Sequence, residues 1–239
     1  MPTSLRDRLG AVTGAVYVIL VLAGNTISTA GIPQPDHATG EQALAAAAHQ
    51  ASSPSAMVGF ALEILGFVAF MFFLGYLTDV LRRKTSTATS GTAAGAAVVA
   101  GVVMLAVKLG SAAPMGALFL DRAHVGPGLA QVLNDMNGVA FVISWLPFAV
   151  FVAATAPALH RAALVGRPTA YLGLVLGVAG VVLAVIGMND PVGATPMGFL
   201  LGLLWLLVVS VRLTVRPGTR RREVGTDSAV ADTHLAARV

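Results

Sequence analysis

The chain of 239 residues has too few charges to coat a water-soluble globule: 56% of its residues are hydrophobic and 11% are charged, against about 25% charged in soluble domains. Its pI near 10.1 would favour a nucleic-acid partner if the basic residues formed a patch on a soluble fold, but they flank apolar runs instead. The composition predicts a membrane protein without a nucleic-acid partner. Because cysteine is absent, disulfides and iron–sulfur clusters are excluded.

The first apolar run covers residues 9–30 and follows Arg6 and Arg8. About 20 apolar residues cross the hydrocarbon core of a bilayer, so the run predicts a membrane span. A cleaved signal peptide is the alternative, because a basic start, an apolar centre and small residues at Ser28 and Ala30 also fit that pattern. We favour the span, since the run is long and its removal would place the new N-terminus outside.

A loop over residues 31–56 separates the first run from the second. Within it, Thr39 and Gln42 have the spacing of a capping box, in which each side chain binds the other residue's backbone N–H. Residues 43–48, which follow, are rich in alanine. The loop is therefore predicted to contain a short surface helix.

The second run, residues 57–81, holds one carboxylate, Glu63, and ends at the basic cluster of Arg82, Arg83 and Lys84. Basic residues beside a span mark its cytoplasmic side. A carboxylate inside a span costs roughly 2.5–3.5 kcal/mol on insertion scales, so it requires a partner or a wet cavity. Glu63 is therefore a candidate functional residue.

Four more apolar runs bring the number of predicted spans to six. They cover residues 91–113, 135–159, 169–188 and 197–215. The predicted fold is an all-α bundle of six transmembrane helices over residues 1–215, with no separate soluble domain. Residues 216–239 are basic at first and then rich in Ala, Asp and Thr, so we expect a disordered cytoplasmic tail.

The fourth run is expected to be kinked. Pro147 removes a backbone donor, which predicts a kink near Ser144 and Trp145. Apolar residues already recur at helical spacing from Leu129, so this helix should begin outside the membrane.

Glycines predict close helix packing in two other spans. They are Gly91, Gly95 and Gly101 in the third run, and Gly173 and Gly177, in GxxxG spacing, in the fifth.

Thirteen of the fifteen Lys and Arg residues fall on one side of the bundle if both termini are cytoplasmic. Arg122 lies in an opposite-side loop, and Lys108 lies inside the third run. This distribution follows the positive-inside rule and predicts an N-in, C-in, multi-pass membrane protein.

Glu63 and Lys108 are expected to lie at the same depth. Glu63 comes six residues after the second span begins, and Lys108 comes about six residues before the third span leaves on the same side, so both lie about 9 Å below the outer boundary. Neighbouring antiparallel helices would bring the two charges together, and pairing would offset the cost of burying each one.

Further polar residues lie in the outer half of the spans, which suggests an outward-facing pocket. With Glu63 and Lys108, the ligand-binding candidates are Asn25, Asp135 and Asn137; secondary candidates are Asp121, His124, Trp145, Asn189 and Asp190. A structural alternative is that the charge pair only fixes the register of the helices.

Several chemistries have no recognisable motif in the chain. HExxH, Walker A, GxSxG and GxGxxG patterns are absent, and no histidine falls deep inside a span. We therefore predict no metal, no cofactor and no catalytic residues. An enzyme is the least favoured class; Asp121 and His124 would be its first candidates.

Four short stretches and the spacing of the spans carry a resemblance to a known family. They are Arg8-Leu9-Gly10-Ala11, the Asp36 loop with its alanine-rich helix, Gly59-Phe60-Ala61-Leu62-Glu63, and Asn134-Asp135-Met136-Asn137. Over about residues 6–215, the chain resembles a bacterial family of six-span membrane proteins known as a domain of unknown function. The resemblance implies a six-helix bundle in a bacterial cytoplasmic membrane, without an assigned activity.

The leading hypothesis is a protein that binds or transports a small polar or amphipathic molecule at Glu63 and Lys108. The alternative is an accessory or scaffold subunit, in which glycine faces such as Gly173 and Gly177 contact another membrane protein and the Glu–Lys pair is purely structural. A homo-oligomer is compatible with either hypothesis. Ligand identity, transport direction and coupling ion cannot be read from the sequence.

Overall fold

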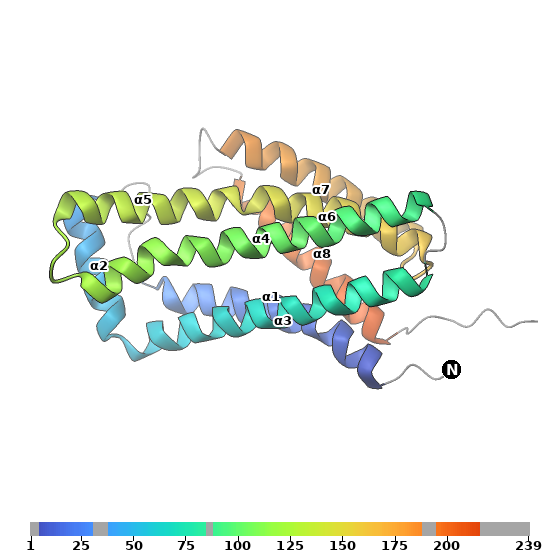
Figure 1. The fold of residues 1–239 in the computed structure, drawn as a ribbon, viewed down its shortest axis with the longest axis horizontal. Helices are drawn as coiled ribbons and strands as arrows, with labels where there is room; N and C mark the ends of the chain where they lie inside the picture. Colours follow the sequence, from blue (N-terminus) through green and yellow to red (C-terminus); the bar gives the residue numbers. More distant parts are fainter. Residues whose placement is uncertain (1–4, 31–37, 85–87, 188–194, 216–239) are drawn as a thin grey trace, which may run out of the picture.

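The structure, a computed structural model, describes residues 5–30, 38–84, 88–187 and 195–215. Every regular element in these ranges is an α-helix, and six stretches are long and apolar enough to cross a membrane. The predicted all-α bundle with six candidate spans is confirmed (Figure 1). The helices are α1 (Leu5–Ser28), α2 (Gly40–Ser52), α3 (Pro54–Lys84), α4 (Ala88–Asp121), α5 (Pro127–Ile143), α6 (Trp145–Arg161), α7 (Arg167–Gly187) and α8 (Thr195–Val215).

The fourth candidate span consists of two helices, α5 and α6, which meet at Ser144. Pro147 has no N–H to offer the carbonyl of Ile143. The Phe148 N–H still reaches the Ser144 carbonyl at 3.4 Å, and the two helices continue in nearly the same direction (Figure 1). The helix is interrupted at Ser144, where the kink was predicted, but the span bends little there, so the interruption is found without a marked kink.

The connection between α4 and α5 is shorter than the sequence predicted. α4 continues through Pro114 to Asp121, beyond the expected end of its span. α5 begins at Pro127, as the helical spacing from Leu129 predicted. Packing holds this extension, because Leu118 of α4 is buried against Ala43 and Ala47 of α2 and Ala130 of α5. The free energy gained by burying these apolar groups is larger than the free energy lost with the hydrogen bond that Pro114 removes.

α1 and α3 form a tight antiparallel pair. A Cβ on Gly24 would lie 2.7 Å from the carbonyl oxygen of Gly59, so only glycine allows the two backbones to approach this closely. At the other end of the pair, Arg83 binds Asp7 at 3.0 Å. Tyr17 of α1 is fully buried in the core.

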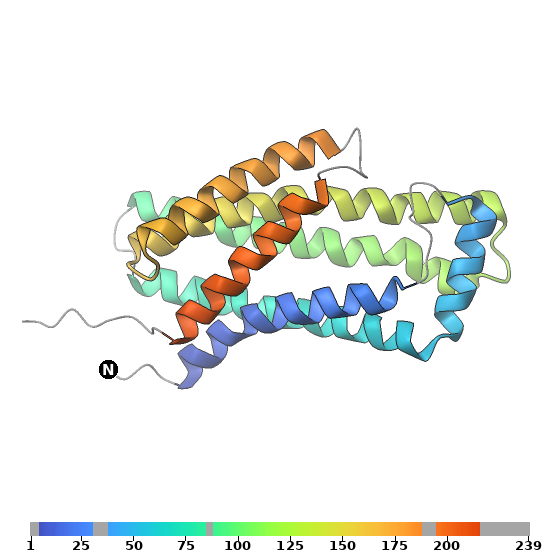
Figure 2. The ribbon, with the colours of Figure 1, turned by 180° about the vertical axis from the view of Figure 1, so that it is seen from behind.

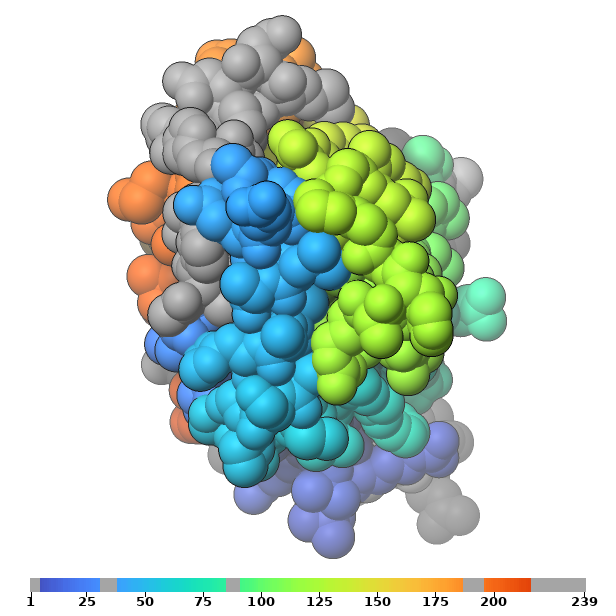
Figure 3. All heavy atoms as spheres, turned by 90° about the vertical axis from the view of Figure 1, so that its left-hand side faces the viewer, coloured from blue at the N-terminus to red at the C-terminus, as the bar shows by residue number. Residues whose placement is uncertain are grey.

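α2 lies across one end of the bundle, where Figures 1 and 3 show it running from the α3 side to α5. The predicted capping box is confirmed: the Gln42 N–H donates to Thr39 Oγ1 at 3.3 Å, and the Thr39 N–H donates to Gln42 Oε1 at 2.8 Å. At Gly40, a Cβ would collide with the Pro127 carbonyl, so α2 sits directly on the start of α5.

The glycines of α7 pack inside the bundle. Gly173 lies against the indole ring of Trp205 in α8, and a Cβ on Gly177 would lie 2.5–2.6 Å from Ala153 of α6. Close packing at these glycines is confirmed. Both glycines contact helices of the same chain. The scaffold hypothesis assumed that they contact another membrane protein, so they no longer support it.

The glycines of α4 divide into two groups. Gly101 packs against Leu74 and Phe151, as predicted, whereas Gly91 and Gly95 have no neighbour within 4 Å of an added Cβ. The prediction of close packing was therefore wrong for Gly91 and Gly95 within the described bundle.

We expect Ala163→Gly to raise the free energy of unfolding by about 0.5 kcal/mol. Ala163 closes α6 with φ 56°, in a motif where Leu164 N–H binds Leu159 O and Ala163 N–H binds His160 O. The left-handed conformation costs a non-glycine residue about 1–2 kcal/mol, partly offset by the extra unfolded-state entropy of glycine. Thermal unfolding in detergent measures the change. Ala162→Gly, at an ordinary negative φ, should lower stability, and a loss at both positions would contradict the prediction.

Candidate functional site

The described basic residues gather at one end of the bundle, opposite α2. Figure 2 shows the start of α1 and the end of α8 meeting there. We call this the basic end and the other the α2 end. Outside the basic end, the described cations are Lys108 and Arg122; those at the basic end are Arg6, Arg8, Arg82, Arg83, Lys84, Arg161, Arg167 and Arg212.

Glu63 is held near the α2 end by groups from two other helices. The Ser28 hydroxyl of α1 donates to Glu63 Oε1 at 3.0 Å, and the Asn25 side chain, also on α1, interacts with the carboxylate. Gln50 of α2 is buried and donates from Nε2 to the Ser28 carbonyl at 2.9 Å. A hydrogen-bond network therefore joins the surface helix α2 to the intramembrane carboxylate.

Lys108 of α4 lies in an aromatic cage. It is 6% exposed, and its Nζ lies 3.1 Å from the ring centroid of Phe141 and 5.4 Å from that of Phe199. The Trp145 ring packs against both, at centroid distances of 5.4 Å and 6.0 Å. In the described part of the chain, Nζ has no hydrogen-bond acceptor. A desolvated cation–π contact contributes about 2 kcal/mol, less than the several kcal/mol that burying an ammonium costs.

The direct contact between Glu63 and Lys108 that their matched depths predicted is not formed. Among the described residues, no ion pair within 4.0 Å joins them, although they interact electrostatically at longer range. The reason is helix pairing: α3 packs mainly on α1, and α4 mainly on α5 and α6. Equal depth brings two side chains together only when their helices are close neighbours.

The other candidates on the spans are divided among different surroundings. Asn25 belongs to the Glu63 network, and Trp145 belongs to the Lys108 cage. Asn137 is half-buried on α5, whereas Asp135 is exposed. Asp135 therefore does not line a buried site in this structure.

The remaining secondary candidates do not join the site. Asp121 and His124 contact each other at 2.7 Å, but both side chains are exposed at the turn after α4. Asn189 and Asp190 lie outside the described residues. Within the described ranges, no three His, Asp or Glu side chains gather closely enough to hold a metal ion.

Four side chains of the site were absent from the predicted set. Ser28 and Gln50 complete the Glu63 network, and Phe141 and Phe199 form the cage around Lys108. The helical face shared by Ser28 and Asn25 was visible in the sequence. The role of Gln50 was not, because it depends on α2 folding back over the bundle.

Comparisons with protein-family models, with curated proteins and with solved structures gave no match. The resemblance to a bacterial six-span family therefore stays a prediction. The functional argument depends on the residues of the site.

Proposed function

We propose that this protein binds a small polar or amphipathic molecule between Glu63 and Lys108, for uptake, release or sensing across the membrane. The observation that supports the proposal is the separation of the two charges. A purely structural pair would be expected to lie in contact, since contact is what offsets the cost of burial. Ionisable residues inside a membrane are rare, and they commonly mark substrate or ion pathways.

The chemistry of the site indicates the groups that such a ligand carries. Lys108 Nζ and Trp145 Nε1 are both donors without an acceptor among the described atoms, so they call for a carboxylate, phosphate or carbonyl oxygen. Glu63, which forms no ion pair with Lys108 among the described residues, would bind a donor or a cation. The rings of Phe141 and Phe199 offer contact for an apolar portion. A zwitterion of amino-acid or betaine type fits this arrangement.

The direction in which the site opens follows from charge. The basic end is the cytoplasmic end under the positive-inside rule, so the α2 end faces away from the cytoplasm of a bacterium. α2 then covers the site from outside, and Gln50 links this cover to the Ser28–Glu63 hydrogen bond. Movement of α2 is the proposed route of entry.

Glu63→Gln should abolish ligand binding and leave the fold intact. The amide oxygen keeps the bond from Ser28, whereas the negative charge that would bind a ligand cation is lost. Native mass spectrometry of the gently extracted protein detects a bound small molecule. Thermal unfolding with a panel of amino acids, betaines and short phosphate esters detects stabilisation.

Glu41→Gln is the matched control, because Glu41 is an exposed carboxylate on α2 at the same end. The control should behave like the parent protein. The proposed site is wrong if the Glu63 variant binds as well as the parent, or if the parent neither carries a small molecule nor responds to the panel.

A further inference from the structure

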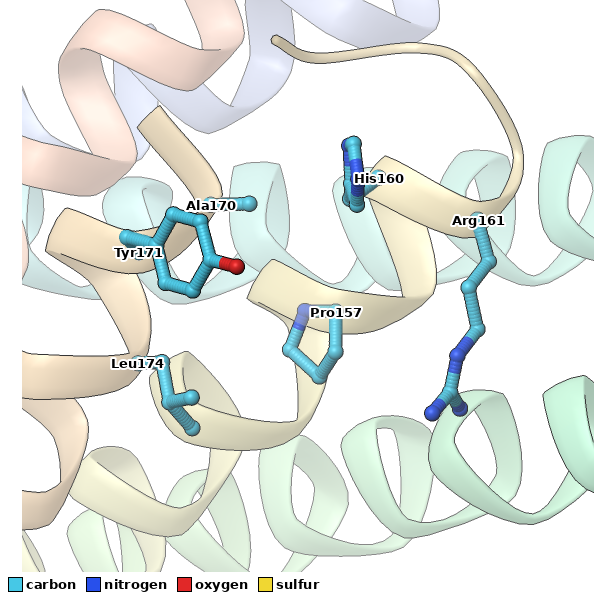
Figure 4. Close-up of a pocket in the computed structure, with 6 residues that line it drawn as sticks. All are labelled: Pro157, His160, Arg161, Ala170, Tyr171 and Leu174. Carbon is cyan, nitrogen blue, oxygen red and sulfur yellow. The ribbon is translucent and has the colours of Figure 1, made fainter. Parts of the chain in front are cut away.

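A pocket of about 170 Å³ opens between α6 and α7 at the basic end, opposite the α2 end near which Glu63 lies. Figure 4 shows the residues that line it. The residues that line the pocket are polar near its mouth and apolar further into the span. Arg161 is the last residue of α6, and Pro157 lies four residues, or about 6 Å, further into the span. On α7, Tyr171 lies four residues after the first residue, Arg167, and Leu174 lies three residues, or about 4.5 Å, further into the span. The lining residues are Pro157, His160, Arg161, Ala170, Tyr171 and Leu174.

The polar groups at the mouth favour an anion. Residues 157–174 contain Arg161, Arg167 and His160 but no Asp or Glu. His160 Nδ1 lies 3.3 Å from the Val165 carbonyl; a hydrogen bond there fixes the imidazole at the mouth. Tyr171 is 67% exposed, and Figure 4 shows its hydroxyl directed toward the pocket side of Pro157. Basic pockets between helices at the cytoplasmic side are the sites where anionic headgroups bind.

The inner part of the pocket favours an acyl chain. Pro157, Ala170 and Leu174 offer carbon surface without a charged group, and Leu174 is 38% exposed toward the lipid side of the bundle. A free phosphate would use only the mouth, whereas a phospholipid uses both parts. We infer that this pocket binds an anionic phospholipid of the adjacent leaflet, with the phosphodiester at the mouth beside His160 and Tyr171, Arg161 adding positive charge nearby, and an acyl chain along Pro157 and Leu174.

Native mass spectrometry in mixed micelles tests this inference with phosphatidylglycerol against phosphatidylcholine at equal concentration. The parent should retain phosphatidylglycerol preferentially. Arg161→Gln should lower its occupancy about fivefold, because one basic residue near a headgroup contributes about 1 kcal/mol. Arg122→Gln, at the α2 end, should leave the preference unchanged. Equal retention of the two lipids by the parent would overturn the inference, whatever the stability of the variants.

Leu174→Trp separates a built site from general attraction to a basic surface. The larger side chain fills the pocket while every positive charge remains, so the preference for phosphatidylglycerol should fall. Glycerophosphoglycerol, the headgroup without acyl chains, should compete weakly. An unchanged preference in Leu174→Trp, or competition by the headgroup alone at equal concentration, would show that the acyl portion makes no contact and would overturn the lipid assignment.

Discussion

Replacement of Lys108 by methionine should raise the free energy of unfolding by about 1–3 kcal/mol and abolish ligand binding. Methionine has nearly the length of lysine and makes favourable sulfur–aromatic contacts, so it fills the cage of Phe141 and Phe199 without a buried charge. Replacing buried ionic groups by apolar ones of similar volume is often stabilising by 1–4 kcal/mol. If Lys108 lowers the stability of the fold in this way, a functional role explains its presence in the buried cage.

Chemical or thermal unfolding of the Lys108→Met protein in detergent measures the change in stability. A structural Glu63–Lys108 pair predicts the opposite sign, a loss of about 3–5 kcal/mol, because Glu63 would be left as an uncompensated charge. Arg122→Met is the control for loss of a cation at the same end; its side chain is exposed, and its stability should change by less than about 0.5 kcal/mol.

A double-mutant cycle with Glu63→Gln then measures the coupling between the two charges. Side chains in direct contact show interaction energies of about 0.5–3 kcal/mol, whereas separated ones add within about 0.5 kcal/mol. We expect near-additivity, since no ion pair within 4.0 Å joins Glu63 and Lys108 in the described structure. Strong coupling together with destabilisation by Lys108→Met would show that the pair is structural.

The features that the sequence predicted correctly are the local ones. The thickness of a bilayer sets the length of a span, so apolar runs alone located six candidate helices. The capping box at Thr39 involves residues three apart, and the break at Ser144 follows from Pro147 within the same turn. Each of these depends on neighbours along the chain, which the sequence displays directly.

The features that were missed depend on which helices pack together. The depth argument for Glu63 and Lys108 assumed that α3 and α4 are close neighbours, but Gly24 and Gly59 bring α3 against α1 instead. Both glycines were visible in the sequence. Their complementarity was not, because it requires the antiparallel register of the two helices. The extension of α4 past Pro114 likewise depends on contacts with α2.

Helix pairing also explains how the candidate site is assembled. The α1–α3 pair carries Glu63 with its hydrogen-bond donor Ser28. α4 carries Lys108, and its rings come from α5 (Phe141) and α8 (Phe199). α2 contacts both sides at their common end. A ligand that bound both charges would therefore hold the two parts of the bundle together beneath α2, and its binding should stabilise the protein against unfolding.

Gly177→Ala should lower the free energy of unfolding by about 2–3 kcal/mol, whereas Gly95→Ala should raise it by about 0.5–1 kcal/mol. The new Cβ at Gly177 would lie 2.5–2.6 Å from the backbone nitrogen, Cα and Cβ of Ala153, so α6 and α7 must move apart, at the cost typical of overpacking. At Gly95 no atom lies within 4 Å, and alanine there adds only its higher helix propensity. Unfolding of the two variants side by side, in one detergent, measures the change in free energy of unfolding for each. Equal and small effects would show that α7 does not pack against α6 through this glycine, and loss of stability at Gly95 alone would indicate that the open face of α4 is covered by another chain.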